Sequence, residues 1–580
     1  MMDKLRHLTT EEQQELIARS CRCEGWESVM VSEDFSPRQL SNVRLSGSVE
    51  IGSGAIIIDS YIENYSIGAE ARIEGVGRLE CRAASTFGNG VEVSTINENG
   101  GRKVAIYEGL TAQCAYLWAI NRHRAAFVER LDSLVGEYSE LSRSSMGRVG
   151  RGSKIIGVKF IREVAIGDSV TIDGASLLEC GTILSGSFVG VDVKAREFII
   201  AEDARLDTGA SLERCFVGER AIVASMFSAI DSLIFASSHL ENGEAAAIFA
   251  GPYTVSHHKS SLLIAGLFSF FNAGSGSNQS NHLFKCGAVH QAIHPRGCKF
   301  ASGAYVMSPA REGAFTMVKG YHAKHHDTSA LPYSYLIDDT AKGRSMLMPA
   351  ANLTSYGTKR DTAKWEQRDK RTTFRDVINY EEHNPYITGA MVRGVNALHS
   401  LSESDEKADE YMWERVTIRR AHLRRGLTLY NKAIAASIGA MLSRGKLTLS
   451  GDTPYSGEWL DVAGAYVPVS FVEELMSRAE EGEITQLSQV GLAFKEFATR
   501  YEDYAHTYAH ALLAQLLGHN PSAEEITQTI EAALRSGEEL ERMTESDRER
   551  DCSLSMAVGY GNDTQDEAIR EADFKAVRGL

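Results

Sequence analysis

Proline is scarce in this 580-residue sequence, which has 10 prolines against 51 glycines. We therefore expect no long proline-rich linkers between its parts. Positive charge is also in short supply, because 61 lysines and arginines face 77 acidic residues and the formal net charge is −16. This balance argues against a general binder of nucleic acid or anionic membranes. A local basic pocket for a phosphate group stays compatible with it.

The nine cysteines are scattered, odd in number and without a CxxC pair, so they do not form a disulfide framework. Reduced thiols fit a cytoplasmic protein. The longest nearly apolar run, Leu262 to Phe271, is too short to span a bilayer. The first 20 residues are charged and contain no apolar core, so we expect no signal peptide.

A six-residue beat of aliphatic residues returns through the first half of the chain, with glycine or aspartate at the turns. Four pairs lie six residues apart: Val164 and Val170, Ile166 and Ile172, Leu206 and Leu212, Phe216 and Ile222. This spacing matches neither a helix nor a simple alternating strand. It is the hexapeptide signature of a parallel β-helix, in which three short strands close each coil and the stacked coils bury one another's apolar faces.

The beat divides the sequence into five regions. Residues 1–45 predict a helix and a cap, and residues 46–104 a first block of coils. Residues 105–147 carry an apolar stripe at helical spacing, which predicts a helical insertion. Residues 148–355 predict further coils that become irregular and rich in histidine, and residues 356–580 a charged linker followed by helices with strong amphipathic stripes.

The stretch from Phe268 to His294 breaks the beat and is rich in glycine, serine and asparagine. Eight of the 17 histidines fall between His257 and His326. Small residues let a ligand approach the backbone, and a neutral imidazole near pH 7 suits proton transfer. We therefore predict the functional site in this region.

Residues 276–287, GSNQSNHLFKCG, resemble the segment around the catalytic histidine in the acetyltransferase domain of the bifunctional enzyme that makes UDP-N-acetylglucosamine. The resemblance places His282 on the general base and Gly287 on a glycine of that motif. This sequence has one extra residue before the histidine, and Lys285 stands where a tyrosine is expected. The whole chain also resembles a largely uncharacterised hexapeptide family of Bacteroidetes-type bacteria.

The resemblance implies a left-handed parallel β-helix and an acetyl-CoA-dependent N-acyltransferase acting on an amino-sugar phosphate or a nucleotide sugar. Trimers are the habit of such enzymes, so a homo-oligomer is expected. The catalytic candidates are His282, Asn281 and Lys285. The substrate-binding candidates are Asn272, Ser277, Asn278, Ser280, His290, His294 and Arg296.

Two other interpretations stay open. Hexapeptide proteins that resemble carbonic anhydrase bind zinc through histidines, and imidazole with carboxylate suits such an ion. The metal-ligand candidates are His322, His325, His326 and Asp327. Alternatively, the chain is a scaffold without catalysis whose helical half binds a partner.

Overall fold

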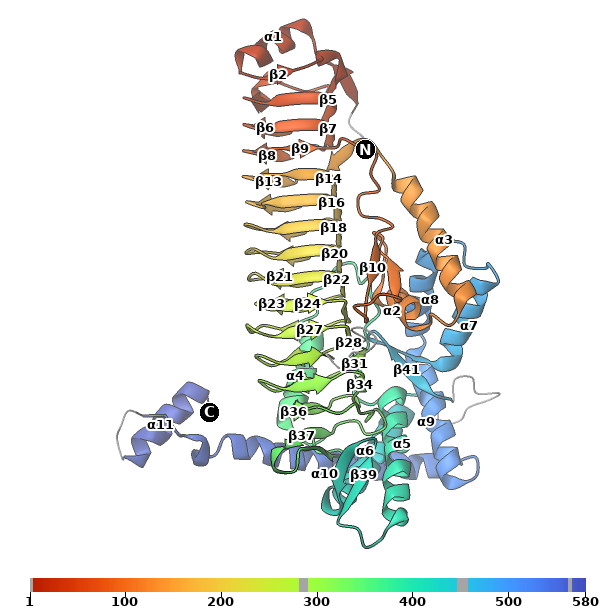
Figure 1. Ribbon diagram of the computed structural model, residues 1–580. Coiled ribbons are helices and arrows are strands. Elements are labelled where there is room, and N and C mark those ends of the chain that lie inside the picture. Colours follow the sequence, from red (N-terminus) through yellow and green to blue (C-terminus); the bar gives the residue numbers. More distant parts are fainter. Residues whose placement is uncertain (1–3, 281–290, 446–456, 562–565, 580) are drawn as a thin grey trace.

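The computed structural model describes residues 4–280, 291–445, 457–561 and 566–579. Flat coils stack into a long column, with helix α1 (Thr10–Ala18) at one end and α5, α6 and α10 at the other (Figure 1). Further helices, among them α2, α3, α7 and α8, lie along one side of the column (Figure 1). The fold is thus a parallel β-solenoid with helical regions.

The coils stack in exact register. On one face Lys154 pairs with Thr171, Thr171 with Phe188 and Phe188 with Arg205, so each coil adds 17 residues. This third face of the solenoid is a continuous parallel ladder. Its strands are β4 (Leu40–Ser41), β6 (Ile56–Ile58), β8 (Arg72–Glu74), β13 (Lys154–Ile156), β15 (Thr171–Asp173), β17 (Phe188–Val189), β19 (Arg205–Leu206), β21 (Ile222–Ala224), β23 (His239–Glu241), β26 (Val255–Ser256), β29 (Asn272–Ala273), β32 (Lys299–Phe300), β35 (Met317–Lys319) and β37 (Tyr335–Asp339).

Strands on the first and second faces are joined in the N-terminal coils and separate in the later ones. Each joined strand bends at one residue, and the set is β5 (Arg44–Ile51), β7 (Tyr61–Ile67), β14 (Ile161–Ile166), β16 (Leu177–Ile183), β18 (Lys194–Ile200), β20 (Ser211–Val217) and β22 (Ser228–Ile234). The first face continues in β24 (Glu244–Ala246), β27 (Leu262–Ile264), β30 (Asn278–Ser280), β33 (Tyr305–Met307) and β36 (Tyr321–His322). The second continues in β25 (Phe249–Ala250), β28 (Gly266–Phe268), β31 (Ala292–His294) and β34 (Ala310–Arg311).

The three corners of each coil explain the six-residue beat. Cys180, Gly186 and Asp192 have φ angles of 52°, 75° and 57° and are six residues apart, and the next corner, Glu197, follows after five. This left-handed backbone is costly for residues other than glycine. The ladders on both sides hold these corners in place. A coil is therefore a triangle of 6, 6 and 5 residues.

The predicted beat marks the core correctly in most positions. Val164, Val170, Ile166 and Ile172 are fully buried inside the solenoid. Ile222 is only half-buried, because the inward-facing residue of that strand is its neighbour Val223. The predicted parallel β-helix with a helical insertion and a helical C-terminal region is confirmed.

One long insertion leaves the solenoid within a single coil. Arg72 pairs with Lys154, a step of 82 residues where other coils take 17. Its elements are β9 (Leu79–Glu80), β10 (Glu92–Ser94), β11 (Lys103–Ala105), α2 (Ala112–Ile120), α3 (Ala125–Ser142) and β12 (Gly147–Val149). We call residues 81–146 the arm. The arm runs down the column and contacts a later coil, where the Ile96 N–H donates to the carbonyl of Ala247 at 2.6 Å.

The helical region begins after strand β38 (Arg344–Met348), which pairs antiparallel with β37 and ends the regular coils. It contains two small hairpins, β39 (Glu410–Trp413) with β40 (Val416–Arg419), and β41 (Trp459–Val462) with β42 (Ala465–Pro468). Its helices are α4 (Tyr356–Gln367), α5 (Pro385–Ser404), α6 (Arg420–Leu442), α7 (Val469–Glu480), α8 (Ser488–Ala498), α9 (Tyr501–Leu517), α10 (Ala523–Asp551) and α11 (Glu567–Arg578).

The opposite end carries the N-terminal cap. Strand β3 (Val29–Ser32) pairs with β5 of the first coils and antiparallel with β1 (Leu5–His7), and β2 (Arg22–Cys23) also pairs with β5. The side chain of Thr9 caps α1 by accepting from the N–H of Glu12. The cap covers the open edge of the solenoid, which would otherwise expose unpaired strand groups.

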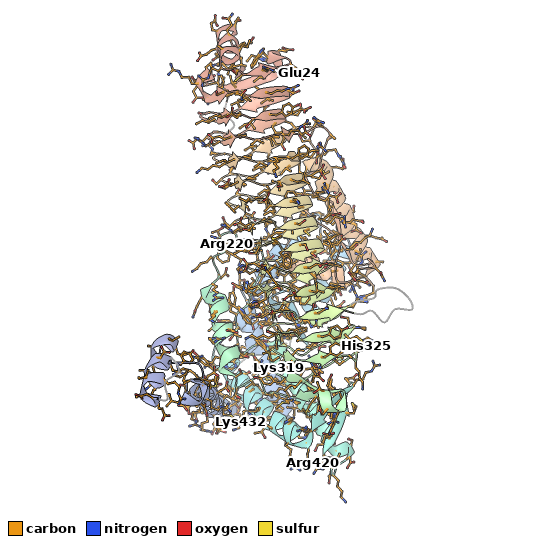
Figure 2. All side chains as sticks on the ribbon, turned by 60° about the vertical axis from the view of Figure 1, so that its left-hand side comes forward. Glu24, Arg220, Lys319, His325, Arg420 and Lys432 are labelled. Atoms are coloured by element: carbon orange, nitrogen blue, oxygen red, sulfur yellow. The ribbon has the colours of Figure 1, made fainter. Side chains whose placement is uncertain are left out.

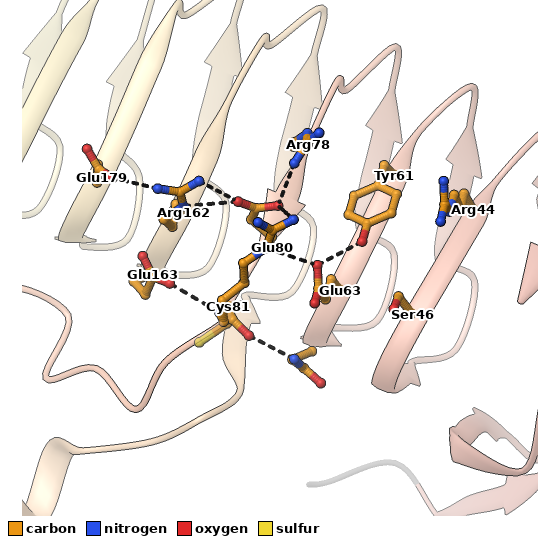
Figure 3. A network of polar contacts seen from close by, with 12 residues as sticks. Arg44, Ser46, Tyr61, Glu63, Arg78, Glu80, Cys81, Arg162, Glu163 and Glu179 are labelled. Carbon is orange, nitrogen blue, oxygen red and sulfur yellow. Dashed lines mark hydrogen bonds and ion pairs between the residues drawn. The ribbon is translucent and has the colours of Figure 1, made fainter. Parts of the chain in front are cut away.

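Charged side chains also stack along the outer wall (Figure 3). The carboxylate of Glu80 is fully buried and lies within 3.5 Å of Arg78, Arg82 and Arg162. Arg162 in turn contacts Glu179 of the next coil at 3.2 Å, and Arg196 contacts the same glutamate. Opposite charges one coil apart are cross-strand neighbours, which favours this register.

Two smaller findings bear on the sequence predictions. The eight cysteines that the structure describes form no disulfide. No helix within the described ranges is both long and apolar enough to cross a membrane.

Candidate functional site

The predicted active segment falls in a coil with additional residues. Asn272 pairs with Lys299, a step of 27 residues, ten more than in the regular coils. The extra length lies between Ser280, the last residue of β30, and Ala292, the first residue of β31. The candidates Asn281, His282, Lys285 and His290 lie outside the described residues, and their roles stay predictions.

The polar candidates just before this point are split between two faces. Asn272 is exposed on β29, on the third face. Ser277 is buried and Asn278 is half-buried at the start of β30, on the first face. Ser280 ends β30, and its side chain is not among the described ones. Asn272 is therefore separated by a corner from the other serine and asparagine candidates.

His294 lies in the solenoid interior and belongs to a buried polar row. Its Nδ1 is 2.6 Å from Oε2 of Glu312, and Nε2 of His326 is 3.1 Å from Oε1 of the same carboxylate. All three side chains are at most 1% exposed. The rings of Phe268, Phe271 and Phe300 surround His294. This row is sealed inside the coils rather than open to a substrate.

The pKa values of this row follow from burial and pairing. Burial alone would raise the pKa of Glu312, but the two imidazoles hold it well below its usual range. Burial opposes protonation of His326, yet the Glu312 carboxylate raises the pKa of that histidine above its usual value. Burial lowers the pKa of His322 to about 4, so this imidazole is neutral at pH 7.

The four metal candidates do not converge. His326 contacts Glu312, while Nδ1 of His322 lies 2.8 Å from Oγ of Ser345. His325 is half-buried near the C-terminal end of the solenoid (Figure 2). Asp327 is exposed and accepts a hydrogen bond from the N–H of Ser329. Within the described parts of the chain these side chains form no shared ligand cluster.

Arg296 joins the solenoid to the helical region instead of facing solvent. Its guanidinium is 2.7 Å from Asp461 and donates to the carbonyls of Asn379 and Gly464. It also lies between the rings of Phe270 and Tyr466, at 3.9 and 4.4 Å from their centroids. The donors of Arg296 are thus used within the protein. Lys299 likewise pairs with Asp361 of α4.

A cavity of about 320 Å³ lies between the solenoid wall and the helical region, and we call it the interface cavity. Its walls come from the last coils, α4, the segment 380–384, α5, α6, β42 and α10. This volume is in the usual range for small-molecule sites. A second cavity of about 640 Å³ shares Glu366 and residues 380–383 with it.

Acidic side chains dominate the charge of the interface cavity. Four glutamates line it, Glu366, Glu381, Glu382 and Glu541, against the two cations Arg296 and Lys359. Both cations are ion-paired, Arg296 with Asp461 and Lys359 with Glu541. Within the described residues, Glu366 and Glu382 form no ion pair. The cavity therefore favours a positively charged ligand.

Aromatic rings complete this preference. Five of them line the interface cavity: Phe315, Tyr333, Trp365, Tyr380 and Tyr466. Phe315 and Tyr333 stack with centroids 4.6 Å apart and nearly parallel planes. The faces of aromatic rings attract cations, and such rings with carboxylates form the usual binding site for ammonium groups.

One titratable side chain in the cavity is suited to proton transfer. Nδ1 of His383 lies 3.1 Å from Oγ of Ser437 on α6. Burial lowers the pKa of His383, Arg444 lowers it further, and Glu382 opposes the change. The imidazole is therefore neutral at pH 7. Within the described residues its Nε2 makes no hydrogen bond, so this nitrogen is available to a ligand.

Sequence reasoning did not single out His383. The signal beside it was structural: Asn384 caps α5 by accepting from the N–H of Ile387, and Pro385 is the first helical residue. A histidine before a helix cap has no chemical signature of its own. Its neighbours in the cavity come from regions far apart in the sequence, so only the fold brings them together.

Fold and site together define a β-solenoid protein whose wall and helical region enclose a ligand-sized, acidic and aromatic cavity. The chain belongs to the family described as "Domain of unknown function (DUF4954)", which matches residues 54–402. Residues 446–580 match a second family described as "Domain of unknown function (DUF6819)".

A relative from Treponema pallidum (strain Nichols), described as "Uncharacterized protein", is 23% identical over 453 residues. The match covers 70% of this chain and 62% of the relative, so the chain spans less than two thirds of that protein. The descriptions of the two families and of this relative name no activity. An acyltransferase function is therefore a proposal.

Proposed function

We propose that this protein is an N-acyltransferase that transfers an acyl group from acetyl-CoA to the amine of a small molecule bound in the interface cavity. The observation that carries the proposal is the placement of neutral His383 in a cavity whose acidic and aromatic lining favours an ammonium group. The hexapeptide resemblance supplies the reaction class and the acyl donor. It also suggests an amino sugar as the acceptor.

The chemistry assigned to each group is as follows. Glu366 and Glu382 attract the ammonium form of the acceptor, and the aromatic rings contact its apolar part. Nδ1–H of His383 donates to Ser437, which leaves the lone pair of Nε2 to take a proton from the ammonium. The free amine then attacks the thioester carbon. A C–N bond forms, the C–S bond breaks, and the imidazolium returns its proton to the leaving thiolate.

The charge distribution narrows the acceptor. Arg296 and Lys299, expected to pair with a phosphate, are already paired with Asp461 and Asp361. An acceptor without phosphate thus fits the interface cavity better than an amino-sugar phosphate or a nucleotide sugar. His282 stays a second candidate for the base, from the resemblance.

The test measures release of free CoA thiol from acetyl-CoA across a panel of amines, amino sugars and their phosphates. We expect turnover with at least one unphosphorylated amine, and a loss of about 10²–10⁴-fold in kcat for His383→Ala, the usual contribution of a general base. His399→Ala is the matched control, because His399 is exposed on α5 and does not line the cavity.

Two results would contradict the proposal. The absence of turnover with every amine would reject acyl transfer. Full activity in His383→Ala, with activity lost in His282→Ala, would reject the interface cavity as the reaction site and favour the base predicted from the resemblance. Binding of the amine to His383→Ala, followed by calorimetry, separates a loss of chemistry from a loss of binding.

A further inference from the structure

Three side chains on the third face of the solenoid converge at one point, separate from the interface cavity and its lining. His239 and Glu241 belong to β23, and His257 directly follows β26 of the next coil. His239 pairs with Val255 and Leu240 with Ser256, which sets Glu241 beside His257. Leu240 and Ser256 are buried. The alternation of a strand therefore directs His239, Glu241 and His257 to the outer side.

The distances among their ligand atoms suit a bound ion. Nε2 of His239 is 3.3 Å from Oε1 of Glu241, and Nδ1 of His257 is 3.6 Å from Oε2 of the same carboxylate. All three ligand atoms lie within 4.8 Å of one another. Ligands about 2.0–2.2 Å from a tetrahedral zinc ion are about 3.4 Å apart. Small side-chain rotations are enough to reach this geometry.

Hydrogen bonding within the cluster accounts for this arrangement less well. The contact of His257 with Glu241 is longer than a normal hydrogen bond. The two imidazole rings are perpendicular with centroids 4.3 Å apart, so both point edges or faces at the same small volume. Oγ of Ser225 lies 3.4 Å from Oε1 of Glu241, a contact that orients the carboxylate.

The cluster is also accessible. The side chains of His239, Glu241 and His257 are 34%, 27% and 41% exposed. An ion can therefore enter from solvent, and its remaining coordination positions face water. Two imidazoles and one carboxylate with open positions are the ligand set of many divalent transition-metal sites.

We propose that His239, Glu241 and His257 bind one divalent first-row transition-metal ion, of which Zn²⁺ fits the ligand set best. The site lies on the wall of the solenoid and bridges two adjacent coils. It is distinct from the candidates His322, His325, His326 and Asp327, which do not converge. It does not depend on the acyltransferase proposal, because none of its residues lines the interface cavity.

The test uses the full-length protein after removal of metal with a chelator, and Co²⁺ as a coloured probe for a zinc site. We expect one equivalent of Co²⁺ to bind with visible d–d absorption bands and to be displaced by Zn²⁺. His239→Ala, His257→Ala and Glu241→Gln should each weaken binding at least about tenfold. His258→Ala is the matched control, since His258 is the exposed neighbour and is not part of the cluster.

Two outcomes would overturn the proposal. One is a wild-type protein that takes up less than one equivalent of Co²⁺ at micromolar concentrations. The other is a His239→Ala/His257→Ala variant that binds Co²⁺ as tightly as the wild type, which would place the ion elsewhere. Thermal unfolding of each metal-free variant checks that the fold is kept, and Glu241→Gln preserves side-chain volume if an alanine variant fails to fold.

Discussion

The buried carboxylate of Glu312 lies between two imidazoles in the solenoid interior, where neighbouring side chains are aromatic. A charge in such surroundings persists only when it is paired and hydrogen-bonded. Glu312 meets this condition through His294 and His326. The three side chains therefore act as one unit, and the removal of one leaves an uncompensated group behind.

We expect Glu312→Gln to destabilise the protein strongly. The substitution leaves the charge of His326 buried without a counter-ion, and breaking a buried pair in this way costs about 3–5 kcal/mol. The midpoint of urea unfolding at pH 7 measures the effect. Glu213→Gln is the control, because its side chain is 48% exposed on the solenoid wall. Equal midpoints for Glu312→Gln and the wild type would contradict this reading of the row.

His322 should make stability fall on acidification. Its pKa is about 4 in the folded protein against 6.5 for the ordinary group, so between these values the unfolded chain binds a proton that the folded protein does not. Its contribution is complete above pH 6.5 and is lost as pH falls toward 4. A shift of this size corresponds to about 3 kcal/mol.

Thermal unfolding between pH 7.5 and 4.5 checks this expectation. His322→Asn keeps a hydrogen-bonding group near Ser345 but does not titrate, so its melting temperature should fall less steeply with pH than that of the wild type. Parallel curves for the two proteins would show that His322 is not the titrating group.

At the scale of elements, one segment without helix or strand ties the helical region to the solenoid. We call residues 368–377 the strap. The carboxylate of Glu219, fully buried at a solenoid corner, accepts from the backbone N–H groups of Thr372, Thr373, Phe374 and Arg375 at 2.6–3.3 Å. Four backbone donors on one carboxylate fix the strap, which leads directly into the wall of the interface cavity.

Glu219→Gln should loosen the strap without disturbing the coils. An amide presents one acceptor oxygen and turns an N–H₂ group toward the other donors. Hydrogen bonds to a charged group are worth about 1.5–3 kcal/mol, which corresponds to about 10–100-fold faster amide exchange. Hydrogen–deuterium exchange of peptides covering 372–375 measures this. Glu197→Gln, at an exposed corner, is the control, and unchanged exchange in Glu219→Gln would refute the role of the carboxylate.

At the scale of the whole molecule, the arm bridges several coils. It leaves the solenoid after Glu80, returns at Gly147, and contacts Ala247 farther along. From Val149 to Ala250 the second face takes six ladder steps. At about 4.8 Å a step, the arm spans about 29 Å of solenoid. The number of coils beneath it must match its length.

Deletion of a coil tests this match. Removal of residues 194–210 takes out one 17-residue coil beneath the arm and leaves strand register intact, since Lys194 pairs with Ser211. Removal of residues 44–60 takes out a coil in the N-terminal part, outside the arm's span, where Arg44 pairs with Tyr61. Both deletions lose one coil of core. We expect the first to lower the melting temperature more, and equal losses would show that the arm tolerates a different coil number.

The sequence was informative where structure repeats. The spacing of Val164, Val170, Ile166 and Ile172 predicted the coils because each stacks on an identical neighbour. The stripe from Phe494 to Ala511 predicted helix but not its division into α8 and α9, which separate at Thr499 and Arg500. A gap of two residues leaves the apolar spacing almost unchanged, so periodicity does not detect it.

The candidate sites were less predictable because they depend on contacts between distant segments. His383 meets Ser437 and Tyr333 across elements far apart in sequence. His239 and Glu241 were not singled out, although the 17-residue register places them beside His257. A coil period applied to the charged residues, and not only to the apolar ones, would have found this second cluster.

The strap turns the solenoid into a ruler for the interface cavity. It is anchored at Glu219, while Phe315 and Tyr333 on the facing wall of the cavity belong to later coils. Strand register allows the distance between anchor and wall to change only by whole coils, in steps of about 4.8 Å. The width of the cavity is therefore quantised. Substitutions that keep the coil count leave it unchanged, whereas a change of one coil displaces one wall by more than the length of a C–C bond and abolishes the site in a single step.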